Sequence, residues 1–231
     1  MEALSGVLAG NPYPGRGVVW ARTGDGRCCG AYFLTGRTRA SQARELRRGD
    51  GELVVAATEG PGGDPLRHYV GARERGEWLV YGNGEQVEEV AGRLDEGAEP
   101  LRALSGLAYE PDPPIHTSRI TVVAHGSTGR AWLGSARRSA GGRDAADVLT
   151  LAVGALAPGD AVLMTTYRSD GRTVATAEPY VDTATRANTP AELAAEIWDV
   201  LAPELRVALA VFEPGHLGSA LLRQRPQPLR H

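Results

Sequence analysis

The sequence predicts an α+β fold of layered sheets, with helices packed outside mostly antiparallel strands. Two observations support this prediction: short β-like runs dominate the chain, and glycine-containing turns join several neighbouring runs. Helical periodicity is confined to fewer segments, which predicts helices inserted between groups of strands.

Short apolar or alternating runs predict the strands. The expected strands are residues 17–22, 28–35, 52–58, 68–73, 77–81, 119–125, 130–136, 161–167, 173–181 and 207–212. Turn signals at 24–26, 75–76, 127–129 and 170–171 fall between consecutive runs and predict antiparallel hairpins.

Four segments have apolar residues at helical spacing. They are residues 87–94, 101–108, 144–157 and a helix that begins at 189–190. Thr189 is suited to an N-cap and Pro190 to the first helical turn, so this last helix is the clearest. We expect one domain over residues 1–222 and a flexible tail over 223–231.

Composition excludes several classes of function. The chain has 231 residues, 42% of them hydrophobic, and a net charge of −3, which is typical of a globular protein and lacks the basic excess of a nucleic-acid binder. All 25 basic residues are arginine. The absence of lysine rules out a P-loop lysine or a lysine Schiff base.

The two cysteines and the N-terminus indicate a reduced, cytoplasmic setting. Cys28 and Cys29 are adjacent and do not have the spacing of a metal site. The first residues lack the basic start of a secretory signal, and no apolar run approaches the roughly 20 residues of a membrane span. We therefore expect no membrane, no metal and no cofactor.

Five polar segments are candidates for the functional site. They are residues 11–17, 32–44, 68–69 with 81–86, 109–120 and 165–171. In the second, Arg37, Arg39 and Arg44 follow the end of a strand. Because guanidinium groups bind phosphate through paired hydrogen bonds, this segment is either an anion cradle or a solvated basic loop.

The other candidate residues have two interpretations each. Asn83 is either a turn residue or an amide that binds a base or carboxamide. Tyr69 is either a core residue with a satisfied hydroxyl or an acid–base group. Glu110, on a stiff proline-rich loop, either pairs with Arg119 or carries out proton transfer. Arg16, near the end of the first segment, is either a solvated side chain or a binding residue.

Together these segments resemble the archaeal-type IMP cyclohydrolase family. The matching pieces are NPYPGRG (11–17), YFLTGR (32–37) with the later Arg44, GNGEQ (82–86), YEPDPP (109–114) with TSRI (117–120), and TTYRSDG (165–171), in family order. The resemblance implies a four-layer αββα sandwich like that of the N-terminal-nucleophile hydrolases. It implies no processed nucleophile, and the chain begins Met1-Glu2.

The implied reaction is ring closure of FAICAR, a formamidoimidazole carboxamide ribonucleotide, to IMP with loss of water. The carboxamide nitrogen attacks the formyl carbon, so the site must align both groups and move protons. The resemblance makes Tyr69 and Glu110 the acid–base pair. Arg44 and Arg119 face charged or polarised oxygens, and Asn83 orients the carboxamide.

Arg16 and Arg37 are the supporting phosphate ligands in this interpretation. The chain departs from the family pattern at 36–44, which is rich in arginine and alanine, and at Gly82. The departures keep two alternatives open: a cyclohydrolase that closes a related ring in nucleoside secondary metabolism, and a purine-nucleotide binder without activity. A solvated interaction protein is the third alternative, and a homo-oligomer is possible in each case.

Overall fold

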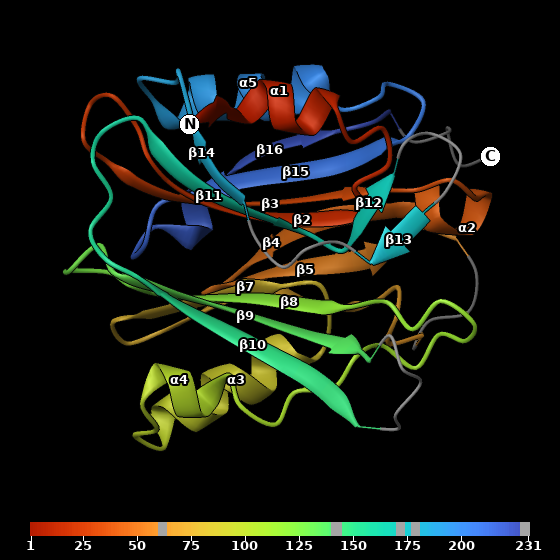
Figure 1. The fold of residues 1–231 in the computed structure, drawn as a ribbon, viewed down its shortest axis with the longest axis horizontal. Helices are drawn as coiled ribbons and strands as arrows, with labels where there is room; N and C mark the ends of the chain where they lie inside the picture. The colour runs from red at the N-terminus through yellow and green to blue at the C-terminus, as the bar shows by residue number, and fades with distance from the viewer. Residues whose placement is uncertain (60–63, 140–144, 170–173, 177–180, 227–231) are drawn as a thin grey trace.

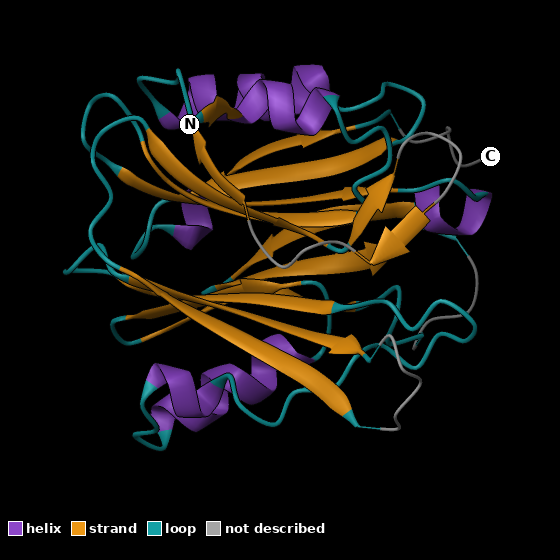
Figure 2. Cartoon of the chain, in the orientation of Figure 1, coloured by secondary structure: helices purple, strands orange, loops and turns teal. Residues whose placement is uncertain are grey.

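A computed structural model describes residues 1–59, 64–139, 145–169, 174–176 and 181–226. Within these residues, two seven-stranded sheets lie face to face, and helices cover the outer face of each sheet (Figures 1 and 2). The expected layered α+β fold is therefore confirmed. No helix in the described ranges has the length and apolar character needed to cross a membrane.

The first sheet contains the strands nearest the N-terminus. Its order is β1 (Glu2–Ala3), β14 (Val181–Ala184), β11 (Asp160–Thr165), β2 (Arg16–Arg22), β3 (Cys28–Thr35), β15 (Arg206–Phe212) and β16 (Leu221–Gln224). All neighbours are antiparallel except β1 and β14. The expected hairpin between β2 and β3 is present, with its turn at residues 24–26.

The second sheet is an antiparallel meander. Its order is β10 (Ala146–Val153), β9 (Ala131–Arg138), β8 (Arg119–His125), β7 (Trp78–Gly82), β6 (Tyr69–Arg75), β5 (Glu52–Ala57) and β4 (Arg44–Gly49). The expected hairpins at 75–76 and 127–129 are confirmed. A small separate pair joins β12 (Tyr167–Ser169) to β13 (Val174–Thr176).

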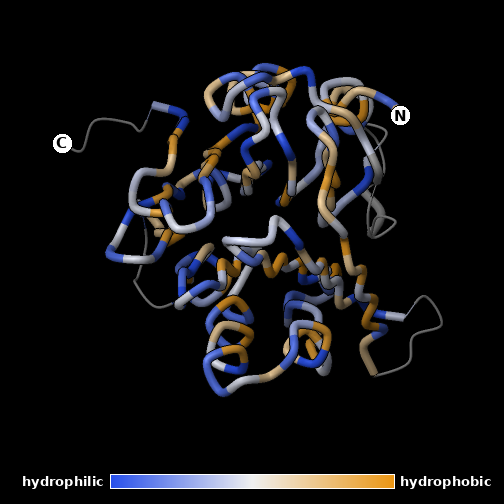
Figure 3. Tube along the Cα trace, turned by 90° about the vertical axis from the view of Figure 1, so that its left-hand side faces the viewer, coloured by the Kyte–Doolittle hydropathy of each residue, from blue (hydrophilic) through white to orange (hydrophobic). Residues whose placement is uncertain are grey.

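Apolar side chains form three layers, one between the sheets and one under each helical face. Helices α1 (Leu4–Ala9) and α5 (Pro190–Val200) cover the first sheet, and α3 (Gln86–Asp95) and α4 (Pro100–Ala103) cover the second (Figure 1). Hydrophobic and hydrophilic residues alternate around these helices (Figure 3), as expected for elements that bury one face. Two short helices, α2 (Arg39–Gln42) and the 3₁₀ turn Leu217–Ser219, complete the described fold.

The prediction of a helix over 144–157 is wrong, because most of this segment forms strand β10. β10 pairs with β9 along its whole length, from Ala146 opposite Arg138 to Val153 opposite Ala131. Apolar residues recur at every second position as well as at helical spacing, and Leu151 and Val153 pack against the layer between the sheets. Pairing with a long neighbouring strand therefore overrides the local helical pattern.

The other expected elements are mostly confirmed. Helix α5 begins as expected, and the Thr189 hydroxyl accepts a hydrogen bond from the Glu192 backbone at 3.2 Å. Strand β4 was not expected. The helix expected at 101–108 is the shorter α4, which ends at Ala103. The strand expected at 173–181 lies partly outside the described residues, as does the turn at 170–171.

The C-terminal strand extends beyond the expected start of the tail. β16 continues to Gln224, whose side-chain amide bonds both backbone groups of Leu46, at 2.8 and 3.1 Å. These two bonds connect the edge strands of the two sheets, β16 and β4. The last residues of the expected tail, 227–231, lie outside the described part of the chain.

Candidate active site

The expected site residues meet at one end of the sandwich, between the two sheets. Arg16 begins β2 in the first sheet, and Tyr69 begins β6 in the second. Asn83 directly follows β7, and Glu110 lies on the loop before β8. This is the end where α2 and β12 lie, the right-hand end in Figure 1.

Glu110 is the centre of the cluster. Its side chain is 4% exposed and accepts hydrogen bonds from the Arg16 guanidinium and, at 2.8 Å, from the Asn83 amide. Burial raises the pKa of Glu110, and the nearby positive charge of Arg16 opposes that rise. A buried carboxyl of this kind is suited to accept and release a proton.

Asn83 holds this carboxyl in position. Its amide nitrogen also donates to the Ser118 carbonyl at 2.9 Å, and its oxygen accepts from the Ile120 backbone at 2.6 Å. Both amide hydrogens therefore have acceptors within the protein. Asn83 thus contacts both Glu110 and the start of β8.

Arg16 carries the positive charge between Glu110 and the tyrosines. Burial by itself would lower its pKa, but Glu110, Tyr69 and Tyr32 nearby more than offset that effect and raise the pKa well above its usual value. Arg16 thus remains charged in the buried site, where it can stabilise negative charge.

Two tyrosines from opposite sheets meet beside Arg16. The Tyr32 hydroxyl in β3 lies 2.7 Å from the Tyr69 hydroxyl in β6. Arg44, 3% exposed, donates to the carbonyls of Ser41 at 2.8 Å and Thr35 at 3.2 Å, and its charge acts on both tyrosines. Arg44 and Tyr69, both expected site residues, thus lie in the same cluster.

Gly15 allows the chain to place Arg16 in the site. Its φ is +73°, and an added Cβ would lie 2.3 Å from the Thr166 hydroxyl and 2.5 Å from Tyr167 Cδ2. Next to it, Arg16 and Thr166 exchange two hydrogen bonds, at 3.0 and 2.8 Å. A side chain at this position would separate the two segments.

Gly15→Ala is expected to destabilise the fold by about 2–4 kcal/mol, because left-handed backbone strain and a steric clash add together. Urea unfolding measures the loss. Gly76→Ala is the matched control: Gly76 has a φ of +55° but nothing within 4 Å of the added atom. Equal losses in the two variants would contradict the close packing at Gly15.

A stack of side chains lies beside the cluster. The Tyr13 and Tyr167 rings are stacked with centroids 5.6 Å apart, and Arg37 Cζ lies 4.4 Å from the centroid of Tyr13. The Tyr167 hydroxyl contacts Thr117, which donates to Asp112 at 2.6 Å. The charges of Arg16 and Glu110 also act on the Tyr167 hydroxyl.

Arg119 lies at the edge of the cluster. Its guanidinium donates to Glu85 at 2.7 Å, and its Nε is buried without a protein partner in the described structure. Its positive charge also acts on Glu110. The ion pair considered between Glu110 and Arg119 is thus replaced by pairs of Glu110 with Arg16 and of Arg119 with Glu85.

Comparison with known proteins identifies the family. The family model described as IMP cyclohydrolase-like protein matches residues 13–214. The chain belongs to this family. It is also 29% identical over 125 residues to the IMP cyclohydrolase of Methanopyrus kandleri, across 53% of this chain and 62% of that protein. The chain therefore aligns with less than two thirds of the length of that relative.

Three residues of this IMP cyclohydrolase-like chain were missed as site candidates. They are Tyr13, Tyr32 and Tyr167, which all lie within the segments that carry the family resemblance. Alternation of apolar residues placed them in strands or turns but did not show which tyrosine faces the site. Their contacts with Arg37, Tyr69, Thr117 and one another join residues 24 or more positions apart, so no local pattern could reveal them.

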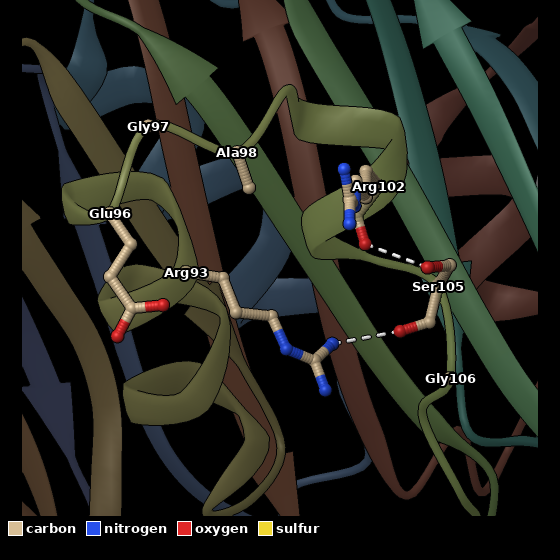
Figure 4. Close-up of a pocket in the computed structure, with 7 residues that line it drawn as sticks. All are labelled: Arg93, Glu96, Gly97, Ala98, Arg102, Ser105 and Gly106. Carbon is tan, nitrogen blue, oxygen red and sulfur yellow. Dashed lines mark hydrogen bonds between the residues drawn. The ribbon is translucent and has the colours of Figure 1, made fainter.

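A separate pocket of about 590 Å³ lies between α3 and α4 (Figure 4). Arg93 crosses it and donates to the backbone carbonyl of Ser105 at 2.8 Å. The same guanidinium donates to the Ala103 carbonyl at 2.8 Å, which joins α3 to α4, and pairs with Glu89 one turn earlier in α3. This pocket shares no lining residue with the cluster around Glu110.

Proposed function

We propose that this IMP cyclohydrolase-like protein closes FAICAR to IMP in purine biosynthesis. The observation that carries the proposal is the buried Glu110 carboxyl, which is bonded to Asn83 and to Arg16, the same arginine whose charge interacts with Tyr69. A proton acceptor, a hydroxyl donor and a buried cation are the groups that this ring closure requires. The family match and the name of the Methanopyrus relative support the same reaction.

The proposed chemistry needs four proton transfers, two that involve Glu110 and two that involve Tyr69. Glu110 takes a proton from the carboxamide nitrogen as that nitrogen forms a bond to the formyl carbon. The formyl oxygen gains a proton from Tyr69 and becomes the carbinolamine hydroxyl. This hydroxyl leaves as water with the proton returned by Glu110, while the nitrogen of the former formamido group gives its N–H proton to the Tyr69 phenolate. The C=N bond of the closed ring forms, and both residues return to their starting protonation states. Arg16 and Arg44 stabilise the negative charge that develops on the formyl oxygen during the attack.

The wider proposal follows the family resemblance. We propose a nucleotide-binding, cytoplasmic hydrolase with one domain over 1–222 and the four-layer sandwich of N-terminal-nucleophile hydrolases. The observed order of helix, sheet, sheet and helix layers supports that fold. Arg119, whose Nε has no protein partner in the described structure, is proposed to bind a substrate oxygen.

Arg37 is the proposed ligand of the substrate phosphate. Its guanidinium lies over Tyr13, which leaves its edge hydrogens facing outward. Arg37→Ala is expected to raise KM for FAICAR about 10-fold with kcat nearly unchanged, because a charge-assisted bond to a non-reacting group is lost. Steady-state kinetics measure both constants.

Arg47→Ala is the control for Arg37. Arg47 is an exposed arginine of β4 that pairs with Glu45, so its removal changes net charge equally without touching the site. If both variants raise KM to the same extent, the effect is one of overall charge, and Arg37 does not bind the phosphate.

The direct test mixes purified protein with FAICAR and follows IMP by absorbance and chromatography. Turnover is the expected result. Calorimetry with AICAR tests binding separately, so a protein that binds AICAR without forming IMP is a nucleotide binder and contradicts the proposed activity. Turnover of a modified imidazole nucleotide but not of FAICAR would place the enzyme in secondary metabolism.

A further inference from the structure

Tyr32 contacts the proposed proton donor but has no role so far. It is fully buried in β3, and its hydroxyl lies 2.7 Å from that of Tyr69. The bond crosses from the first sheet to the second, between residues 37 positions apart. A buried hydroxyl needs a partner, and Tyr69 is the one that the described residues supply.

The burial of the two tyrosines favours one direction for this hydrogen bond, although the geometry alone allows either hydroxyl to donate. Tyr32 is fully buried, and Tyr69 is the acceptor that the described residues supply for its hydrogen, so Tyr32 is assigned as the donor. Tyr69 then keeps its own hydrogen for a different acceptor. Tyr69, at 6% exposed, is less completely buried than Tyr32, at 0%.

The backbone around Tyr69 is shaped to receive the Tyr32 ring. Gly71 lies two residues after Tyr69 on the same face of β6, and an added Cβ would lie 3.3 Å from Tyr32 Cε1. The missing side chain lets the ring lie directly against β6. The position of the Tyr32 hydroxyl is therefore determined by both sheets.

We infer that Tyr32 is a positioning residue that directs the Tyr69 proton toward the substrate and stabilises the Tyr69 phenolate. This inference rests on the proposed function. When Tyr69 gives its proton to the substrate oxygen, the electron pair of its O–H bond stays on Tyr69. The Tyr32 bond is not broken; it becomes a charge-assisted bond to the phenolate, alongside the charges of Arg16 and Arg44.

Tyr32→Phe is expected to lower kcat for FAICAR about 10- to 100-fold, the effect of losing one hydrogen bond to a developing charge, and to leave KM unchanged. Tyr81→Phe is the matched control. Tyr81 is also fully buried, and its hydroxyl joins the two sheets by donating to the Val19 carbonyl at 2.8 Å, away from the cluster. Urea unfolding of both variants separates stability from rate.

A double variant tests whether Tyr32 acts through Tyr69. In a Tyr69→Phe background, a further Tyr32→Phe change is expected to cause no additional loss of kcat. Gly71→Ala, which keeps both hydroxyls but shifts the Tyr32 ring, is expected to lower kcat in the same direction. It serves as the second variant if Tyr32→Phe does not fold.

Four outcomes would overturn the inference. Turnover at the wild-type rate by Tyr32→Phe would show that Tyr32 does not position Tyr69, and the proposed function would stand. Equal losses of kcat in Tyr32→Phe and Tyr81→Phe would show that the loss comes from disturbed packing between the sheets and not from the hydrogen bond to Tyr69. Full additivity with Tyr69→Phe shows that Tyr32 acts independently of Tyr69. Absence of turnover by the wild type itself overturns the proposed function, and this role with it.

Discussion

Glu110→Gln is expected to lower kcat for FAICAR closure by about 10²–10⁴-fold, the range for loss of a general acid–base group. The amide has nearly the shape of the carboxyl but cannot accept the proton of the attacking nitrogen. Asn83 can still donate to the remaining oxygen, so the position of the group is largely kept. Steady-state formation of IMP measures the loss.

Glu196→Gln is the control for this change. Glu196 is a partly buried carboxylate on α5 in the outer helical layer, and it accepts a hydrogen bond from the Thr185 hydroxyl. We expect it to retain the wild-type kcat. A Glu110→Gln enzyme with kcat within a few-fold of the wild type would exclude Glu110 as the base.

Arg16→Met is expected to reduce both activity and stability. At neutral pH the free energy of unfolding should fall by about 3–5 kcal/mol, because Glu110 is left buried without its cation. Loss of the charge that stabilises the oxyanion should also lower kcat by about 10²-fold or more. Urea unfolding and steady-state kinetics measure the two effects separately.

The stability loss in Arg16→Met should depend on pH. Burial already raises the pKa of Glu110, and removing Arg16 removes the positive charge that opposes the rise. The folded variant therefore binds the Glu110 proton more tightly than the unfolded chain, whose glutamate pKa is about 4.3. Stability is thus retained below that pH and lost as pH rises through the folded-state pKa. The deficit relative to wild type should shrink between pH 7 and pH 4.

Arg206→Met is the control for the pH effect. Arg206 is a partly buried arginine that lies over Trp198 and donates to its backbone carbonyl at 2.9 Å. Since this bond involves a carbonyl, its loss should depend little on pH over the same range. A deficit in Arg16→Met that stays constant from pH 7 to pH 4 would contradict the coupling between Arg16 and Glu110.

Local sequence patterns were sufficient to predict most strands and the clearest helix. Alternating residues and glycine turns predicted the hairpin of β2 and β3, because side-chain direction in a strand alternates at every residue. Thr189 and Pro190 predicted the start of α5 for a similarly local reason. β10 was mistaken for a helix because its apolar spacing fits both structures, and only pairing with β9 decided between them.

The sequence by itself determined the residue types of the candidate site and the strand ends on which they lie. Only the tertiary structure decided their partners: Glu110 bonds Arg16 across 94 residues, and Tyr32 meets Tyr69 from the opposite sheet. The physical reason is the distance along the chain over which each interaction acts. Backbone periodicity is set by neighbours a few residues apart, whereas the pairing of buried charges and hydroxyls depends on how two sheets pack face to face.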